Sequence, residues 1–340
     1  MKKTAAWIMT MVMAVGLFTA CAPKTEAPSG STETGSTETG STEEGAGEYA
    51  WPVKTIELIV PASAGGDTDF NARTMAKYFE ELTGVTVVVT NMTGGGGTIA
   101  SSHVKESDPD GSVMFFGHTG QLIVNEVAGL ADYGVEDFEI AAIPGIDKST
   151  VFVVSASSGI TNVAELAEAS KEKPIIYGSE LGGYTHLQGL IFGELTGTNL
   201  NTVDVGAAAE KITNLLGGRI DLMSIAYGAV QDYITTGEMV VIGQVSAERN
   251  PLLGDIPTIK EQGFDFAMDK PYIAAYPKGT DAELIANVSA AMEEVGKNPA
   301  YAKELEEGYK QPVSFLNSAD ATALLLELRE DYMQYADKLK

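Results

Sequence analysis

The chain has 340 residues, of which 44% are hydrophobic, and this is enough apolar material for two domains with cores of their own. Its 47 acidic residues outnumber its 22 basic ones, which gives a formal net charge of −25. A field of that sign repels nucleic acid and anionic lipid headgroups, so neither is an expected partner. It does not exclude a small anion, because aligned backbone dipoles bind one without Lys or Arg.

The first twenty residues have the form of an export signal. Lys2 and Lys3 precede an apolar run from Ala5 to Phe18, which is too short to cross a membrane comfortably. The stretch LFTAC ends at Cys21 and looks like a bacterial lipobox, in which the cysteine is lipidated and becomes the first residue of the mature protein. The alternative is an ordinary cleavable signal followed by an unmodified cysteine. Since Cys21 is the sole cysteine, internal disulfides and Cys-based zinc sites are excluded.

Residues 21–50 are predicted to form a tether. They carry a Gly-Ser-Thr-Glu-Thr repeat, and residues 22–48 contain no apolar side chain larger than Ala. Such a segment cannot offset its ordering entropy by burying surface, so a flexible, mildly acidic linker is expected. A signal at 1–20, this tether and a globular body from Trp51 together predict an exported protein.

The body begins with a strand, a loop of small residues and a helix. Residues 56–60 are mostly apolar, Pro61 ends the strand, and two glycines permit a turn before a helix that Asp67 or Thr68 can cap. The loop and the helix N-terminus present free backbone N–H groups above the end of the strand. This stretch is therefore predicted to be one wall of a ligand site.

The same strand–loop–helix unit recurs along the rest of the body. Pro144 and Gly145 are expected to separate two of the strands. Further strands are predicted at 86–90, 113–116, 140–143, 151–154, 175–177, 203–205, 220–225 and 240–245. Helices are predicted from 98 and 122, at 162–170, 187–196, 210–216, 230–235, 281–296 and 300–308, and from 319 to 339. This alternation predicts an α/β protein with helices on both faces of its sheets.

Ligands in such sheets bind at the carboxyl ends of the strands. Four loops have that position, and they span 61–69, 117–121, 179–186 and 204–210. All four are rich in Gly, Ala, Ser and Thr and poor in Lys and Arg, so they are expected to hydrogen-bond a small polar solute.

Five motifs occur in the body in a fixed order: IVPASAGGDTDFNAR, TNMTGGGGTIA, GGYTHLQG, LLGGRIDLM and IPTIKEQGF. In this order they resemble the tripartite tricarboxylate transporter substrate-binding proteins, also called the Bug receptor family, over essentially all of residues 51–340. The resemblance implies a type II periplasmic-binding-protein fold, with two α/β lobes and a ligand cleft between them. Lobe one is expected at 51–149 plus 271–340, and lobe two at 150–270.

The resemblance also implies the function. A receptor of this kind is expected outside the cytoplasm, anchored to the cell membrane through Cys21, as a monomer without enzymatic activity, cofactor or metal. It is expected to bind a small carboxylate and deliver it to a two-subunit membrane permease. The residues expected at the ligand are Ala62, Ser63, Ala64, Gly65, Asp69, His118, Thr119, Gly120, Gln121, Gly183, Tyr184, Thr185, His186, Asp204, Gly206, Ala226 and Tyr227.

Two departures from the family pattern bear on the ligand. Asp67 stands where the family commonly has Gly, which adds negative charge to a wall of the site. The loop from Asp204 lacks the aromatic residue and the cation that the family carries there. We therefore expect residues 63–65 to cradle a carboxylate, and the ligand to carry a polar or cationic group near Asp69 or Asp204.

Some residues of the body allow other interpretations. His103, His118 and His186 lack the spacing of a zinc site, and His186 is either an orienting side chain or a ligand contact. The Gly-x-Gly-x-x-Ala sequence at 95–100 fits a dinucleotide fingerprint, but the next strand ends in Gly-His and not in an acid. Tyr227 faces the cleft or packs in the hinge.

The sequence contains no hydrolase, Walker A or zincin motif. Two nearby acids, Asp67 and Asp69, are more typical of a helix start than of glycoside chemistry. Two other function classes stay open at this point: an exported sensor that signals to a membrane partner, and an adhesin or scaffold that binds no small molecule.

Overall fold

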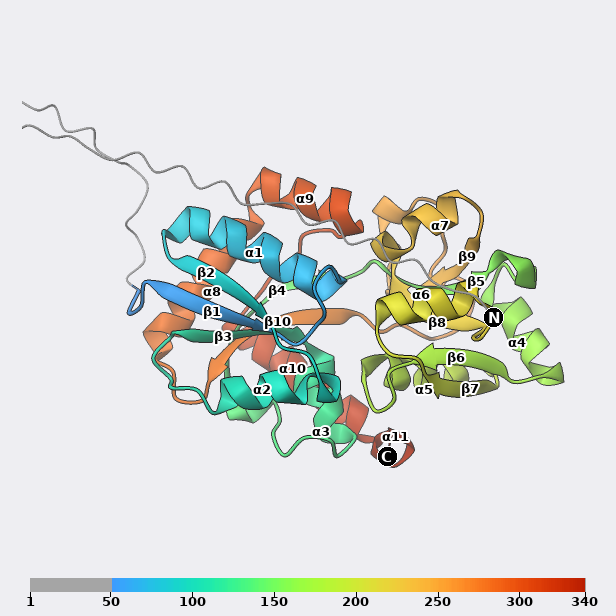
Figure 1. Ribbon diagram of the computed structural model, residues 1–340, viewed down its shortest axis with the longest axis horizontal. Helices are drawn as coiled ribbons and strands as arrows, with labels where there is room; N and C mark the ends of the chain where they lie inside the picture. Colours follow the sequence, from blue (N-terminus) through green and yellow to red (C-terminus); the bar gives the residue numbers. More distant parts are fainter. Residues whose placement is uncertain (1–50, 340) are drawn as a thin grey trace, which may run out of the picture. The chain divides into compact units, whose positions relative to one another are not determined.

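The computed structural model describes residues 51–339, which all fall within one compact unit. The predicted signal peptide, the tether and the lipidation site at Cys21 lie outside the described residues. Strands and helices alternate along the body, as the sequence pattern predicts, and the strands form two separate sheets (Figure 1).

The first sheet has six strands in the order β11-β4-β10-β3-β1-β2. β2, β1 and β3 are parallel, whereas β10 runs antiparallel to both β3 and β4. The strands are β1 (Thr55–Val60), β2 (Thr86–Asn91), β3 (Val113–His118), β4 (Phe138–Asp147), β10 (Lys270–Pro277) and β11 (Leu316–Asn317).

The second sheet has five strands in the order β7-β6-β8-β5-β9. Here β7, β6 and β8 are parallel, and β5 runs antiparallel to its two neighbours. The strands are β5 (Thr150–Ser155), β6 (Ile175–Ser179), β7 (Leu200–Asp204), β8 (Leu222–Ala226) and β9 (Met239–Gln244). We call the six-stranded sheet with its helices lobe one, and the five-stranded sheet with its helices lobe two.

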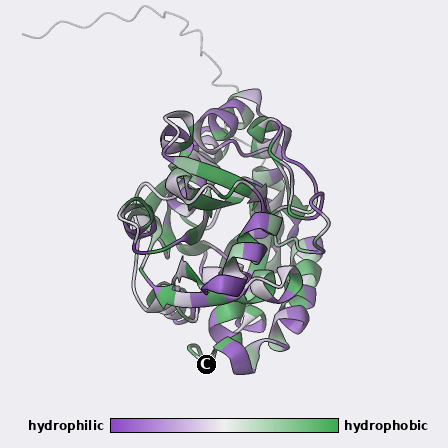
Figure 2. Ribbon diagram, turned by 90° about the vertical axis from the view of Figure 1, so that its right-hand side faces the viewer, coloured by the Kyte–Doolittle hydropathy of each residue, from purple (hydrophilic) through white to green (hydrophobic). Residues whose placement is uncertain are grey.

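Helices cover both faces of each sheet, and in Figure 2 the strands are mostly hydrophobic whereas the helices mix both kinds of residue. The longer helices are α1 (Asp67–Thr83), α2 (Thr98–Lys105), α4 (Val163–Glu172), α5 (Tyr184–Thr196), α6 (Ala208–Leu216), α8 (Ala282–Gly296), α9 (Pro299–Tyr309) and α10 (Ser318–Met333). The short ones are α3 (Asn125–Val127), α7 (Gln231–Thr235) and α11 (Ala336–Leu339).

The two faces of lobe one are separated by the twofold period of its strands. In β10, Tyr272, Ala274 and Tyr276 pack with α1, α8 and α9, while Ile273 and Ala275 pack with α2 and α10. All five side chains are fully buried. A strand covered on both faces needs apolar residues at every position, which explains why this segment reads as a continuous apolar run.

The chain crosses between the sheets twice. It leaves β4 at Asp147 to begin β5 at Thr150, and it returns to begin β10 at Lys270. Asp147 and Lys270 are register partners in the first sheet, and their side chains form an ion pair of 3.0 Å. The Thr150 hydroxyl donates to Asp147 Oδ2 at 2.7 Å within the first crossing segment, and the ion pair binds that segment to the second.

Two local predictions need correction. Pro144 and Gly145 do not end a strand: they lie inside β4, where the register to β10 shifts and no ladder bond requires a proline N–H. Neither Asp67 nor Thr68 caps α1, because its N-cap is Gly66 and no side chain serves there. The C-terminal segment, expected in lobe one, also contacts lobe two: Lys338 in α11 pairs with Glu194 in α5 at 2.6 Å.

Candidate ligand-binding cavity

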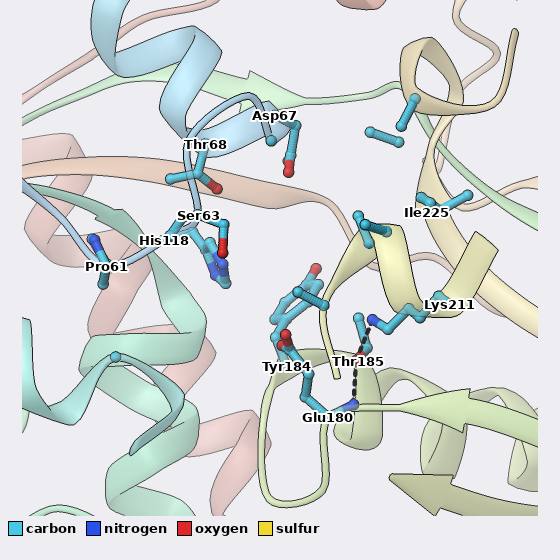
Figure 3. Close-up of a pocket in the computed structure, with 18 of the residues that line it drawn as sticks. Pro61, Ser63, Asp67, Thr68, His118, Glu180, Tyr184, Thr185, Lys211 and Ile225 are labelled. Carbon is cyan, nitrogen blue, oxygen red and sulfur yellow. Dashed lines mark hydrogen bonds between the residues drawn. The ribbon is translucent and has the colours of Figure 1, made fainter. Parts of the chain in front are cut away.

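A cavity of about 640 Å³ is lined by residues of both lobes. Lobe one contributes the loop before α1, the glycines before α2 and the end of β3, and lobe two contributes the starts of α5 and α6 and the end of β8. Figure 3 shows Ser63 and His118 on one side and Lys211 with Thr185 on the other. The volume suits a small metabolite.

Asp69 fixes the loop before α1 from the side that faces away from the cavity. It is 3% exposed, and its carboxylate accepts bonds from the Gly65 N–H at 2.8 Å, from Arg73 at 2.9 Å and from the Asn91 amide at 2.8 Å. Asn91 also donates to the Ala62 carbonyl at 2.9 Å. These contacts hold the pKa of Asp69 below its ordinary value against the opposing effect of burial. The loop is thus fixed by side chains that do not face the cavity.

The negative charge that Asp67 adds to the cavity wall is compensated. Burial opposes its ionisation, but the Lys270 ammonium in direct contact outweighs burial and lowers the pKa of Asp67 to about 2. The Tyr272 hydroxyl also donates to its Oδ2 at 2.9 Å. Lys270 contacts Asp147 as well, and these two carboxylates raise its pKa although burial opposes its charge. In this part of the wall the charges of Asp67, Lys270 and Asp147 are therefore paired with one another.

His118 is a neutral imidazole at the cavity. Burial lowers its pKa to about 3, and the positive charge of Lys270 acts in the same direction. Its Nδ1 accepts from the Gly120 N–H at 3.0 Å, so the proton of the neutral ring lies on Nε2. The backbone N–H of His118 donates to the side-chain oxygen of Gln121 at 2.8 Å and so holds Gln121 in place. The ring also contacts Tyr184, with centroids 5.5 Å apart.

The lobe-two wall contains a buried cation. Lys211, in α6, is 4% exposed, and its Nζ donates to the Thr185 hydroxyl at 3.1 Å (Figure 3). Gln188 lies one turn beyond Thr185 in α5 and is fully buried, and neither its side-chain oxygen nor its nitrogen has a partner among the described residues. All three side chains line the cavity.

The helices that begin at the cavity lack side-chain caps. Among the described residues, eight helices have eight residues or more. The N-caps of α1, α2, α5 and α6 are Gly66, Gly97, Gly183 and Ala207, which offer no side-chain acceptor, and the first residues of all four helices or their caps line the cavity. The remaining four, α4, α8, α9 and α10, begin elsewhere and are capped by the side chains of Asn162, Asp281, Asn298 and Asn317. Uncapped N–H groups thus converge on this cavity.

The structure divides the predicted ligand residues into two sets. Those that line the cavity are Ala62, Ser63, Ala64, Gly65, His118, Gln121, Tyr184, Thr185 and Ala226. Those that do not are Asp69, Thr119, Gly120, Gly183, His186, Asp204, Gly206 and Tyr227.

Several of the second set have other roles. Asp69 and His186 bond their own loops, since His186 Nδ1 accepts from the Gly182 N–H at 3.1 Å. Asp204 is exposed at the end of β7 and does not reach the cavity. Neither Asp69 nor Asp204 is therefore placed at the cavity to meet a cationic ligand group, although Glu180 and Glu210 line it. The Gly65 N–H is also unavailable to a ligand, because it donates to Asp69.

The sequence analysis did not predict Lys211, Lys270 or Gln188, which line the cavity from outside the four predicted loops. One signal for Lys211 was present: it lies four residues before Leu215, on the buried stripe of α6. Lys270 follows no motif, and only the pairing of β10 with β4 brings it to Asp147. Gly94, Gly96 and Gly97 line the cavity too, although the sequence required no ligand contact from them.

Within residues 51–339 no cluster of His, Cys, Asp and Glu is suited to a metal ion. No helix in the same range has the length and apolar character needed to span a bilayer.

Residues 71–328 match the family described as the tripartite tricarboxylate transporter family receptor. The chain belongs to this family. The protein BugT of Bordetella pertussis is 25% identical over 257 residues, which are 74% of this chain and 78% of BugT. A UPF0065 protein of Bordetella bronchiseptica is also 25% identical, over 83% of this chain and 84% of the relative.

Solved structures show the same fold. The periplasmic binding protein BugD is 25% identical, with a TM-score of 0.74 over 85% of this chain and 98% of BugD. A periplasmic transporter protein, also 25% identical, has a TM-score of 0.76 over the same shares. MatC of Rhodopseudomonas palustris with bound malate is 20% identical and shares the fold with a TM-score of 0.74. This tripartite-type receptor thus has the predicted two-lobed α/β fold of periplasmic binding proteins.

Proposed function

We propose that this receptor captures a small carboxylate-bearing metabolite in the cavity between its lobes and delivers it to a two-subunit permease of the tripartite type. The observation that carries the proposal is the distribution of helix caps. The four longer helices that start at the cavity have no side-chain acceptor for their first N–H groups, and the four that start elsewhere each have one. Orphan N–H groups at a helix N-terminus favour an anion.

In lobe one the carboxylate is proposed to lie between the first turn of α1 and His118. Residues Ser63 and Ala64 bring the loop to the cavity, and the Nε2–H of His118 supplies a donor that stays neutral at physiological pH. Because Lys270 offsets the charge of Asp67, that acid does not repel the ligand.

Delivery needs a change of lobe arrangement that the ligand drives. A solute that contacts both walls stabilises the arrangement in which the walls are close, and only its differential affinity for that state supplies the free energy. We further propose that Cys21 carries the lipid that keeps the receptor at the membrane. Production of Cys21→Ser in the native host tests this: the variant is expected in the released fraction and the parent protein in the membrane fraction.

The receptor function is tested on the purified protein with succinate, glutarate, adipate and their amides. The carboxylates are expected to give saturable thermal shifts, because ligand binding stabilises the folded state by mass action, and the amides are not. Native mass spectrometry of the protein as isolated identifies a co-purified solute directly. The proposal fails if no carboxylate binds, or if proton NMR detects conversion of a bound compound to product.

A further inference from the structure

The lobe-two wall holds a charge without a counter-ion. Lys211 is 4% exposed, and no carboxylate among the described residues lies within ion-pair distance of its Nζ, whose one protein acceptor is the Thr185 hydroxyl at 3.1 Å. Lys270, by contrast, is also buried but contacts two carboxylates. A buried ammonium without a partner is costly, so its retention at a cavity wall indicates an anion that is present only in the bound state.

The groups that face Lys211 do not neutralise it. Glu180, on the loop before α5, and Asp204, on the loop before α6, are exposed, and both act on Lys211 from beyond contact distance. Asp67 and Lys270 act on it with opposite signs. Burial is the largest influence and lowers the pKa of Lys211. A ligand anion in contact with Nζ would reverse that effect.

A second unsatisfied group lies on the same wall. Gln188 is fully buried, lines the cavity and has a free amide nitrogen and a free amide oxygen. It shares a helix face with Thr185, whose hydroxyl accepts from Lys211. An ammonium, a hydroxyl and an amide donor therefore form one polar corner, and each has hydrogen-bonding capacity left for a ligand.

We propose that Lys211 is the specificity-determining residue of this receptor and binds a second anionic group of the ligand. This inference rests on the proposed function, in which the first carboxylate lies at α1 and His118. The ligand is then a dianion whose two charged ends contact different lobes. A monocarboxylate of equal length leaves Lys211 buried and unpaired, and so binds more weakly.

The test compares dianions with matched monoanions by calorimetry: succinate with butyrate, glutarate with pentanoate, and adipate with hexanoate. In the parent protein at least one dianion is expected to bind roughly 10- to 100-fold more tightly than its partner, the value of one charge-assisted hydrogen bond. Lys211→Met is expected to lose that preference and to keep its affinity for the monoanion, and Lys211→Arg to retain the preference. Lys171→Met is the matched control, since Lys171 is 68% exposed in α4 of the same lobe.

The outcomes separate the two proposals. If no carboxylate binds to the parent protein, the receptor function and the role of Lys211 both fail. If carboxylates bind but the parent protein does not prefer any dianion, or if Lys211→Met keeps the preference, only the role of Lys211 fails. The comparison of dianions with monoanions in the parent protein needs no variant, so it tests the role of Lys211 even if Lys211→Met does not fold.

Discussion

Replacement of Lys270 by Met is predicted to be the most damaging single change in the ionic network beside the cavity. The lysine side chain is 11% exposed and contacts Asp67 and Asp147, and the Asp147 side chain is completely buried. Removal of one member of a buried ion pair typically costs about 3–5 kcal/mol, because a charge is left without its partner. We expect a loss of that size in the free energy of unfolding.

The contribution of Asp67 follows from its pKa, which falls from 3.8 to about 2 in the folded protein. Since one pKa unit corresponds to about 1.4 kcal/mol, Asp67→Asn should cost about 2 kcal/mol at neutral pH. The ionised form is the one that Lys270 stabilises, so this contribution is complete above the unfolded pKa of 3.8 and is lost as pH falls to about 2. The difference between parent and variant should shrink over that window.

Urea unfolding of both single variants and of the double variant measures the coupling directly. With Lys270 absent, Asp67→Asn should no longer destabilise, so the double variant should be about 2 kcal/mol more stable than the sum of the single losses predicts. Lys278→Met is the control: Lys278 pairs with Glu139 but is 61% exposed, so its loss should cost less than about 1 kcal/mol. Strict additivity, or a loss below about 1 kcal/mol for Lys270→Met, would refute the reasoning.

Three further predictions concern the walls of the cavity. Asp69→Asn weakens the acceptor of the Gly65 N–H and should cost about 1–3 kcal/mol of stability and reduce carboxylate affinity; unchanged calorimetric affinity would mean that the loop needs no such support. Tyr309→Phe removes a donor to the Gly65 carbonyl at 2.8 Å and should cost about 1 kcal/mol in urea unfolding, whereas Tyr233→Phe at an unrelated position should cost less. Affinity for a dianion should fall as pH rises through the lowered pKa of Lys211, because the protonated form binds. Lys211→Met should abolish this dependence of affinity on pH. An equal pH dependence in the parent protein and the variant would contradict the prediction.

Most of the fold could be predicted because its determinants are local. Apolar runs bounded by Gly and Pro set the strands, and Asn or Asp at 162, 281, 298 and 317 set four helix starts. The prediction that Pro144 ends a strand failed for a reason that is not local. Pro144 is tolerated inside β4 because β4 carries an extra residue against β10 at that point, and this pairing depends on a strand that lies far along the chain.

The site was harder to predict because its charges come from residues outside the loops that carry motifs. Loop positions such as Ser63 and Thr185 could be placed from the strand–loop–helix pattern, and both line the cavity. Lys211 sits inside a helix and Lys270 on a crossing segment, so their neighbours are set by tertiary packing. Asp69 was misassigned because a helix-start acid has the same sequence pattern whether it faces a solute or its own loop.

The two crossing segments are paired with each other and so form one connection between the sheets. Residues 145–147 and 270–272 are hydrogen-bonded as adjacent strands, and the ion pair between Asp147 and Lys270 lies at their end. Because hinge motions are absorbed by a few residues at the ends of elements, we expect the lobes to rotate about these paired segments. Because Thr150 and Lys270 line the cavity, part of its wall belongs to the paired segments, and a rotation there would change the shape of the cavity.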